Sequence, residues 1–228
     1  MTPFEALTGE YAVWWIDFLG EHTHVGGADS TGWLLERSKL RPGEAMLDAG
    51  CFIGSAARLA AARLAVRAFA SDVNTDFLRA GRASSGGAAV SWAAAANQRL
   101  PFASGAFQSV WALDSPLAPR ELSRVAAAEA TLCLCCEVPT DNRGGLESFL
   151  DEWAEYGWNL AAHKPLSLEA TQAWRRAEAE LVRRRPHFEG RYGSRGYLAQ
   201  LDLMARMVMS YERGEQGHGL FVLSRGGR

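Results

Sequence analysis

The chain has 228 residues, of which 48% are hydrophobic, and its formal net charge is -2 at pH 7. A chain of this length and composition is typical of one soluble globular domain with a large core. No apolar run approaches the roughly 18 residues of a membrane span, and the first residues lack the basic start and apolar core of a signal peptide. We therefore expect a cytoplasmic protein.

The cysteines are Cys51, Cys133, Cys135 and Cys136, and three of them lie in the run CLCC within an apolar stretch. This spacing is poor for a disulfide framework, so free thiols are expected. Neighbouring residues of an extended segment point to opposite faces, whereas a metal site needs convergent ligands. The sequence therefore predicts no metal site in this run, and none elsewhere.

The N-terminal part is predicted to be helical. The opening TPFE resembles an N-cap, a first-turn proline and a capping-box acid, which predicts a helix over residues 3–18. The polar, glycine-containing stretch that follows predicts a loop over residues 21–29, and Ser30 is expected to cap a second helix over 30–40. Residues 1–40 would then form a helical cap or lid over the rest of the domain.

Extended and helical patterns alternate through residues 41–166, the predicted nucleotide-binding core. Strands are predicted over 45–47, up to residue 72, and over 89–93, 108–113, 131–138 and 159–163. Helices are predicted over 55–64, after Asn74 or Thr75, after the pair Ser115 and Pro116, and over 145–156. Such alternation predicts a doubly wound α/β fold with a mostly parallel sheet.

Residues 167–228 are predicted to hold a helical segment and the last strand. Residues 167–212 predict two helices joined by PHFEGRYGSRGY, and residues 219–224 predict a strand. No internal repeat or low-complexity linker divides the chain, so residues 1–228 are expected to form a single domain.

The stretch LDAGCFIGSAA lies where such sheets bind ligands, beyond the carboxyl end of a strand. Gly50 and Gly54 would let the backbone approach a ligand, and the next helix begins with N–H groups that suit an anion. Asp72 ends the second strand, where an acid can accept from both hydroxyls of a ribose. A nucleoside site and ordinary turn glycines with a helix cap both remain open on these residues alone.

Three stretches, LDAGCFIGSAARLA, AFASDVNTDFL and NQRLPFASGAFQSVWALDS, resemble in order and spacing the first three motifs of the class I S-adenosylmethionine-dependent methyltransferases. The leading YAVWWIDFLGEHTHVGGADST and the ending YERGEQGHGLFVLSRGG resemble the small-molecule branch with sarcosine/dimethylglycine, tocopherol and natural-product methyltransferases. The resemblance implies a Rossmann-like, seven-stranded sheet whose last strand is antiparallel beside the fifth. It also implies S-adenosylmethionine as cofactor and methyl transfer to an N, O or S atom of a small metabolite.

By this resemblance, the turn after the first strand lines the methionine part of the cofactor, and Asp72 holds the ribose. An amide oxygen near residue 97 would accept from the adenine amino group. The implied cofactor-binding residues are Asp48, Gly50, Cys51, Phe52, Gly54, Asp72, Val73, Asn74, Asn97 and Gln98.

Three positions depart from the family pattern: Phe52 replaces a glycine, and Ala96 and Gln108 replace acids. The Phe52 side chain could enter the methionine space, pack on neighbouring helices or stack on the ligand, and we favour the packing. Two alternatives to methyl transfer therefore stay open. One is a methyltransferase-fold binding or partner subunit without transfer activity, and the other is an enzyme for another reaction, such as a cyclisation.

The acceptor side is expected near the N-terminal segment and the end of the fourth strand. His24, and less directly His22, could act as a base, although a cap-bonding histidine is the alternative. Ser115 after the fourth strand could contact the acceptor or cap a helix, and Trp14 could line the pocket or pack in the core. The predicted substrate-binding residues are Tyr11, Trp15, His24 and Asp114.

The arginine-rich stretch WRRAEAELVRRRPHFEGRYGSR contains interspersed glutamates, and Lys39 and Lys164 are the only lysines of the chain. This pattern favours a solvated helix face over nucleic-acid recognition. The expected partner is a small-molecule acceptor, with no membrane, and a homodimer or a partner-protein complex is left open.

Overall fold

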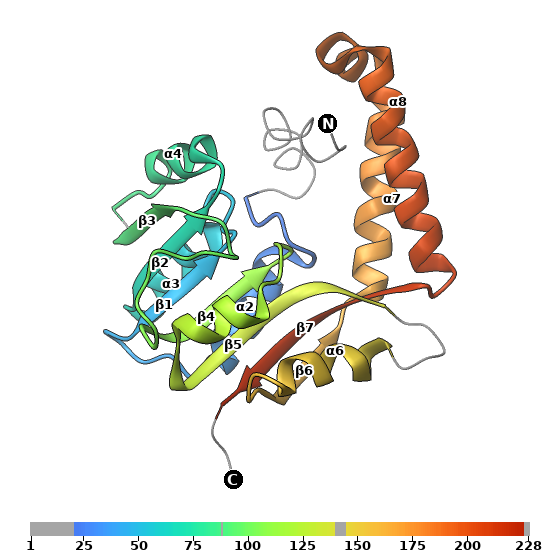
Figure 1. Cartoon of the computed structure of the whole chain (residues 1–228). Helices are drawn as coiled ribbons and strands as arrows, with labels where there is room; N and C mark the ends of the chain where they lie inside the picture. The colour runs from blue at the N-terminus through green and yellow to red at the C-terminus, as the bar shows by residue number, and fades with distance from the viewer. Residues whose placement is uncertain (1–20, 88, 140–144, 226–228) are drawn as a thin grey trace.

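A computed structural model of the chain describes residues 21–87, 89–139 and 145–225 (Figure 1). The helix predicted over 3–18, and with it Tyr11, Trp14 and Trp15, lies outside the described residues. No described helix combines the length and the apolar character needed to cross a bilayer.

The core of the fold is a seven-stranded sheet of order β3-β2-β1-β4-β5-β7-β6. Its strands are β1 (Ala45–Ala49), β2 (Arg67–Asp72), β3 (Val90–Ala94), β4 (Phe107–Leu113), β5 (Ala126–Pro139), β6 (Asn159–Pro165) and β7 (Gln216–Ser224). The first five strands pair in parallel, whereas β7 runs antiparallel between β5 and β6. The predicted sheet and its antiparallel last strand are confirmed.

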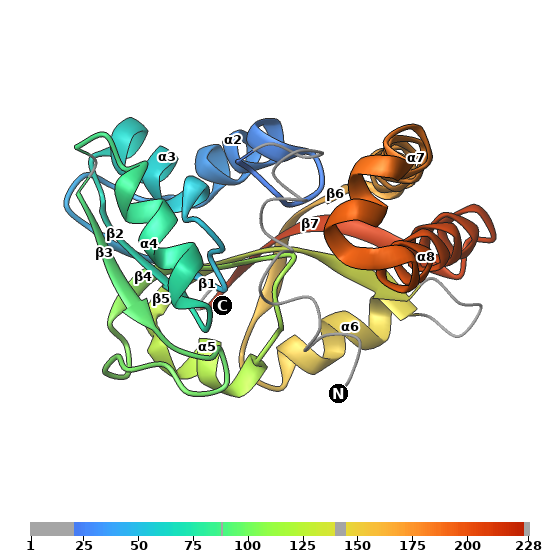
Figure 2. The ribbon, with the colours of Figure 1, turned by 90° about the horizontal axis from the view of Figure 1, so that it is seen from above.

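Helices cover both faces of the sheet (Figure 2). They are α2 (Gly27–Arg37), α3 (Ser55–Leu64), α4 (Thr75–Ala83), α5 (Pro119–Val125), α6 (Gly145–Ala154), α7 (Ser167–Arg183) and α8 (Arg185–Glu212). One buried cluster includes Leu34 of α2, Ala57 of α3 and Leu78 of α4. A second cluster contains Leu122 of α5 and Trp153 of α6, so the two sets of helices bury opposite sides of the sheet.

One predicted helix start is wrong. The second helix begins at Gly27 after Gly26 with φ 78, so Ser30 lies buried inside its first turn rather than at its cap. Glycine adopts this left-handed conformation at no steric cost, which allows the chain to enter the helix earlier. The helix predicted after Ser115 and Pro116 begins at Pro119, and Ser115 does not cap it, because its hydroxyl donates to the carbonyl of Ala49 at 2.8 Å.

The predicted joint between the last two helices is confirmed in part. A first break falls at Arg184, just before PHFEGRYGSRGY, and a second lies within this stretch at Gly193, whose φ of 70° and ψ of 160° separate two helical pieces of α8. The proline of this stretch stands in the first turn of α8, a position that tolerates its missing N–H.

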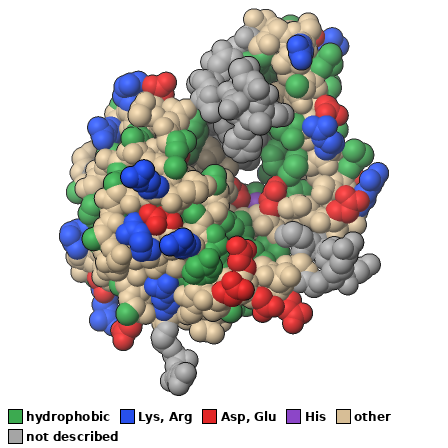
Figure 3. All heavy atoms as spheres, viewed as in Figure 1, with side chains coloured by type: hydrophobic (Ala, Val, Ile, Leu, Met, Phe, Trp, Pro, Cys, Tyr) green, Lys and Arg blue, Asp and Glu red, His purple; other side chains and the backbone are tan. Residues whose placement is uncertain are grey.

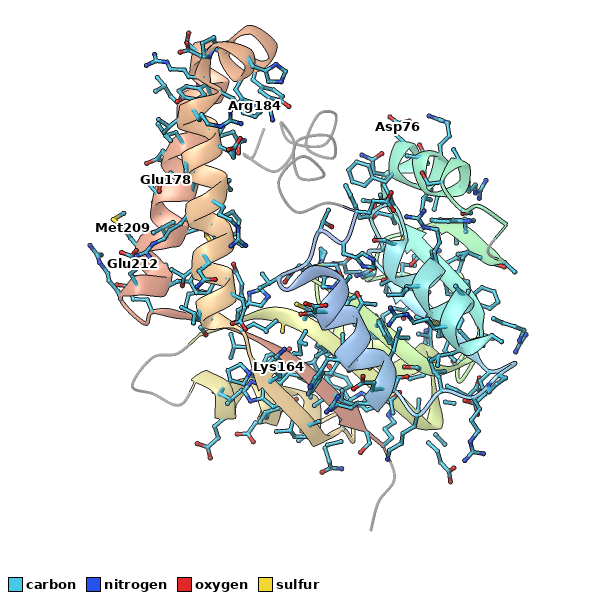
Figure 4. The ribbon with its side chains drawn as sticks, turned by 180° about the vertical axis from the view of Figure 1, so that it is seen from behind. Asp76, Lys164, Glu178, Arg184, Met209 and Glu212 are labelled. Carbon is cyan, nitrogen blue, oxygen red and sulfur yellow. The ribbon has the colours of Figure 1, made fainter. Side chains whose placement is uncertain are left out.

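The helices α7 and α8 form an arm beside the sheet (Figures 1 and 4). Arg184 marks its tip and Glu212 lies near its base, where Glu212 pairs with Arg175 (Figure 4). Side chains of both helices make a separate small core: Ala177, Leu181, Phe188, Tyr197 and Met204. The arm is therefore held together by its own apolar contacts.

Gly81 of α4 lies where no side chain fits. A Cβ there would be 2.4 Å from the carbonyl oxygen of Ile53 and 2.5 Å from the Trp92 ring. We expect Gly81→Ala to lower the free energy of unfolding by about 1 to 3 kcal/mol.

Gly190 of α8 has nothing within 4 Å of the added Cβ. Gly190→Ala should therefore stabilise by about 0.5 to 1 kcal/mol. Urea unfolding checks both, and a Gly81→Ala protein as stable as the wild type would contradict the packing.

Candidate functional site

The turn between β1 and α3 lies at the switch point of the sheet, where the neighbours of β1 are β2 and β4. Its φ angles are positive at Gly50 (70°), Phe52 (55°) and Gly54 (67°). A Cβ at Gly50 would stand 2.4 Å from Ser115 Cβ, and one at Gly54 would stand 2.5 Å from the Trp92 ring. Backbone conformation and packing thus require both glycines, whatever the turn binds.

Four N–H groups of this turn are already bonded within the protein. Gly50 and Cys51 both donate to the carbonyl of Ser71 at 2.8 Å, and Gly54 donates to the carbonyl of Cys51 at 2.8 Å. Phe52 donates to Asp72 Oδ2 at 3.0 Å. The turn is therefore tied to the end of β2 and does not present these groups to an anion.

Asp72 lies at the carboxyl end of β2 with its carboxylate against the turn. Besides the bond from Phe52, its Oδ1 accepts from the N–H of Asn74 at 2.8 Å. Burial raises the pKa of this carboxyl, while the backbone donors act in the opposite direction. Each oxygen can accept more than one hydrogen bond, so the carboxylate keeps acceptor capacity for ligand hydroxyls.

The residues after Asp72 differ in what they expose. The Val73 side chain is 67% exposed, although it is large and apolar. Asn74 caps α4 by accepting from the N–H of Asp76 at 2.9 Å, which confirms the predicted cap. An apolar surface next to a bonded carboxylate is suited to the flat face of a base beside a ribose.

The Phe52 ring packs on α4, with its centroid 4.7 Å from that of Phe77 in an edge-on arrangement. This contact agrees with the packing that we favoured from the sequence. A non-glycine residue in the left-handed region costs roughly 1 to 2 kcal/mol. The aromatic pair recovers about 0.5 to 1.5 kcal/mol.

Asp48 lies buried at the end of β1, 2% exposed, and accepts from the N–H of Ala57 in the first turn of α3 at 3.2 Å. It therefore replaces the missing side-chain cap of this helix. Burial, with a smaller contribution from the neighbouring Asp72, raises the pKa of Asp48 to about 7, although the Ala57 N–H lowers it.

The remaining predicted cofactor residues have other partners. Cys51 is buried, and burial raises the pKa of its thiol. Asn97 is buried too, and its Nδ2 donates to the carbonyl of Pro116 at 2.9 Å. Gln98 is exposed. The amide of Asn97 thus holds the loop after β4, and its contact with adenine stays a prediction.

Of the two remaining departures from the family pattern, one lies far from this edge. Gln108 stands at the amino end of β4, where its Oε1 accepts from the N–H of Ala45 at 2.9 Å. An amide oxygen can accept this hydrogen bond as a carboxylate would. Gln108 lies at the end of the sheet opposite to Asp72. Ala96 carries no carboxylate, and its carbonyl accepts from the N–H of Arg99 at 2.9 Å.

A second cluster lies across the switch point, at the ends of β4 and β5. Asp114 follows β4 with φ 47, its Oδ2 accepts from the N–H of Val25 at 2.9 Å, and its Oδ1 lies 2.9 Å from His218 Nε2. His218 Nδ1 lies 2.9 Å from the hydroxyl of Tyr211, which donates to Glu137 Oε1 at 3.4 Å. We call these residues, with Cys135, the Asp114 network.

The charges within the Asp114 network support one another. Burial lowers the pKa of His218, but Asp114 and Glu137 outweigh it, so the net shift is upward. Burial raises the pKa of Asp114, but His218 and the N–H of Val25 outweigh it, so the net shift is downward. Each partner therefore favours the charged form of the other. Figure 3 shows a hollow between the sheet and the arm, where a histidine and acidic side chains are visible.

Sequence reasoning named Asp114 but missed Glu137, Tyr211 and His218. These three come from β5, α8 and β7, and their spacing matches no motif. The only signal is a histidine directly before the apolar run of the last strand.

His24 lies close to the Asp114 network but is bonded elsewhere. Its Nε2 is 3.0 Å from the hydroxyl of Thr31, which is also 3.1 Å from His22 Nδ1. Burial lowers the pKa of His24 to about 4, although Asp114 acts in the opposite direction. This geometry favours a structural role, and the catalytic role stays a prediction.

An open groove of about 800 Å³ lies elsewhere, along α3 and the turn over residues 84–87. Neither Asp72 nor Asp114 lines it, so it belongs to neither half of the site described above.

The raised pKa of Asp48 makes the free energy of unfolding depend on pH. Its folded-state pKa of about 7 lies above the ordinary value of 3.8, so the folded protein binds more protons between these values. Its contribution to the free energy of unfolding therefore falls as the pH rises from about 4 to 7. Asp48→Asn should remove this loss and be more stable than the wild type at pH 8, by up to roughly 3 kcal/mol, but not at pH 4. Urea unfolding at both pH values measures it, and an equal difference at both would contradict the shift.

Phe52→Gly should leave the free energy of unfolding within about 1 kcal/mol of the wild type, because relief of the left-handed strain offsets the lost ring contact. Phe77→Ala is the matched control, since it loses the same contact without relieving strain and should be the less stable variant. Thermal and urea unfolding compare the two proteins. A larger loss for Phe52→Gly than for Phe77→Ala would show that the strain is not relieved.

Comparison with solved structures gives the same fold. A protein described as a sarcosine dimethylglycine methyltransferase from Galdieria sulphuraria matches with a TM-score of 0.82 at 13% identity, over 96% of this chain and 97% of that one. A cyclopropane synthase from Mycobacterium tuberculosis matches with a TM-score of 0.82 at 13% identity, over 98% of both chains. The cyclase SpnF matches with a TM-score of 0.71 at 22% identity, over 86% of this chain and 79% of that one.

No family model and no curated protein matches the sequence. The structural matches include methyltransferases and enzymes named for other reactions. With its sheet order and antiparallel β7, the chain has the Rossmann-like fold of the class I methyltransferases and is structurally similar to the small-molecule S-adenosylmethionine-dependent members.

Proposed function

We propose that the protein is an S-adenosylmethionine-dependent methyltransferase that acts on an N, O or S atom of a small metabolite. The carboxylate of Asp72 carries this proposal, because it lies at the end of β2 against the glycine turn of β1. Solved structures of the same fold include a phosphoethanolamine N-methyltransferase in complex with S-adenosyl-L-methionine, from Haemonchus contortus, at 13% identity.

The residues near Asp72 fit the nucleoside half of that cofactor. The carboxylate retains lone pairs for two ribose hydroxyls, and the exposed Val73 offers an apolar contact for adenine. The carboxyl of Asp48 would lie near the cationic methionine end, where positive charge favours its ionised form. When bound, the cofactor supplies an activated methyl group on a sulfonium.

The Asp114 network would serve the acceptor. A quarter of the Asp114 side-chain surface is exposed, whereas His218 beneath it is 3% exposed. Asp114 is therefore the member that an acceptor reaches, and its carboxylate can hold a cationic amine. His218 keeps the carboxylate charged and oriented, so these residues would mainly position the acceptor.

A second candidate function is a reaction other than methyl transfer. The structural similarity to the cyclase SpnF and to a cyclopropane synthase supports it. A methyl-release assay over a panel of amines, thiols and hydroxyl compounds distinguishes the candidates. Binding of S-adenosylmethionine without transfer to any of them would favour a ring-forming enzyme or a partner subunit.

Phe52 offers a separate test of the partner-subunit alternative. With the ring packed on Phe77, Phe52→Gly should change the affinity for S-adenosylmethionine less than threefold. A gain of tenfold or more, equivalent to about 1.4 kcal/mol, with unchanged adenosine affinity, would show that the ring blocks the methionine end.

We predict that Asp72→Ala weakens binding of S-adenosylhomocysteine by roughly 1.5 to 3 kcal/mol, because charge-assisted bonds to the ribose are lost. Calorimetry measures this loss in the purified protein. Asp72→Asn keeps an acceptor for the backbone N–H groups and should separate ribose binding from damage to the turn. The exposed Asp76, which pairs with Arg79, provides the control Asp76→Ala. Unchanged affinity in both Asp72 variants would refute the ribose site.

We also propose that residues 1–228 act as one domain, with a cap or lid over residues 1–40, a core over 41–166 and a helical segment with the last strand over 167–228. The cytoplasmic location and a homodimer or partner complex stay predictions.

A further inference from the structure

We propose that Asp114, Cys135 and His218 form a site for one divalent transition-metal ion of the zinc type. Their ligand atoms all lie within 4.8 Å of one another. His218 Nε2 is 2.9 Å from Asp114 Oδ1 and 3.4 Å from Cys135 Sγ, and Cys135 Sγ is 3.7 Å from Asp114 Oδ2.

These separations are close to the edges of a tetrahedral ligand set. With the usual zinc distances to sulfur, nitrogen and oxygen, tetrahedral angles place pairs of ligand atoms roughly 3.3 to 3.6 Å apart. The separation of His218 from Cys135 lies in this range, and the two separations of Asp114, which involve different carboxylate oxygens, lie on either side of it. Small side-chain shifts would therefore admit the ion. A thiolate, an imidazole and a carboxylate together suit zinc and its neighbours better than magnesium or calcium.

The backbone holds the three ligands on rigid elements. The N–H of Asp114 donates to the carbonyl of Cys135 at 2.7 Å, which fixes the end of β4 against β5. In the antiparallel pair of β5 and β7, Cys135 lies opposite Leu220 and Glu137 opposite His218. Cys135 and His218 are therefore diagonal neighbours on one face of the sheet.

Groups around the ligands are arranged as in metal sites. A metal-bound histidine usually donates its second N–H to an acceptor, which sets its orientation and basicity. Here Nδ1 of His218 faces the hydroxyl of Tyr211, which in turn donates to Glu137. The second oxygen of Glu137 accepts from Gln216 Nε2 at 3.2 Å, so both oxygens of the carboxylate at the end of this chain of donors are hydrogen-bonded.

One of the three cysteines of CLCC takes part, and the other two do not. Cys136 lies in the core on the other face of the sheet, and Cys133 lies deeper on the same face as Cys135. The partners of Cys135 come from β7 and from the end of β4, so the proposed site departs from the prediction, made from the sequence, of no metal site in the chain.

Three protein ligands leave a tetrahedral ion one open position, as in catalytic zinc sites. Because Asp114 is the exposed member of the three ligands, the open coordination position would face the acceptor side. An ion there would bind the acceptor as a thiol or hydroxyl and lower its pKa, which forms the nucleophile at neutral pH. This role rests on the proposed function, whereas the ion site itself does not.

The test uses Co²⁺ alone as the probe, added to the reduced, chelator-treated full chain. We expect one equivalent to bind, with the visible absorption of a four-coordinate ion and a thiolate charge-transfer band, and Zn²⁺ to displace it. Cys135→Ser should abolish the charge-transfer band, and His218→Gln should weaken binding at least tenfold. Tyr211→Phe keeps all three ligands and should weaken binding about tenfold or more.

Cys133→Ser is the matched control, since it makes the same change two residues away on the same strand and face and should leave the Co²⁺ spectrum unchanged. Circular dichroism verifies that each variant is folded. Absence of saturable Co²⁺ binding in the folded wild type would overturn the proposal. So would a thiolate charge-transfer band that persists in Cys135→Ser, or a Co²⁺ affinity that is unchanged in both His218→Gln and Tyr211→Phe. Neither result depends on methyl transfer, so failure of the metal site remains distinct from failure of the proposed activity.

Discussion

The pairing of β1 with β2 on one side and β4 on the other is the constraint on which the site depends. All five residues of β1 are buried, so the strand has no freedom to shift without exposing its apolar side chains. Because the three strands are parallel, their carboxyl ends meet at one edge of the sheet. Asp72 therefore stands on one side of the turn after β1, and Asp114 on the other.

Backbone strain gathers at this same edge. Among the described residues, four that are not glycine have positive φ, and two of these are Phe52 and Asp114. Hydrogen bonds hold both in place: the N–H of Phe52 bonds Asp72, and the N–H of Asp114 bonds the carbonyl of Cys135. Strain of this kind persists only where the surroundings determine the conformation, and it is common at binding sites.

Three carboxyls at the edge experience different electrostatic surroundings. Burial raises the pKa of Asp48 and Asp72, which have backbone donors but no cation beside them. The pairing with His218 lowers the pKa of Asp114. A cationic ligand would therefore be stabilised most by the ionised carboxylates of Asp48 and Asp72, because Asp114 already has His218 as its partner. Pairs of acids pushed in opposite directions commonly carry different roles in one site.

The sequence by itself determined the alternation of strands and helices. It also determined the place of the glycine turn after β1 and of Asp72 at the end of β2. Each of these depends on local patterns of apolar residues, caps and turn residues. It also predicted the antiparallel last strand, through the family resemblance. It misplaced the start of α2 and the alternative cap at Ser115, where glycine conformation and the Ser115 bond override the local cap signal, and it did not predict the break at Arg184. Only the tertiary structure brought Cys135, Glu137, Tyr211 and His218 to Asp114. Contacts between residues more than 70 positions apart follow from sheet order and register, and spacing along the chain does not encode them.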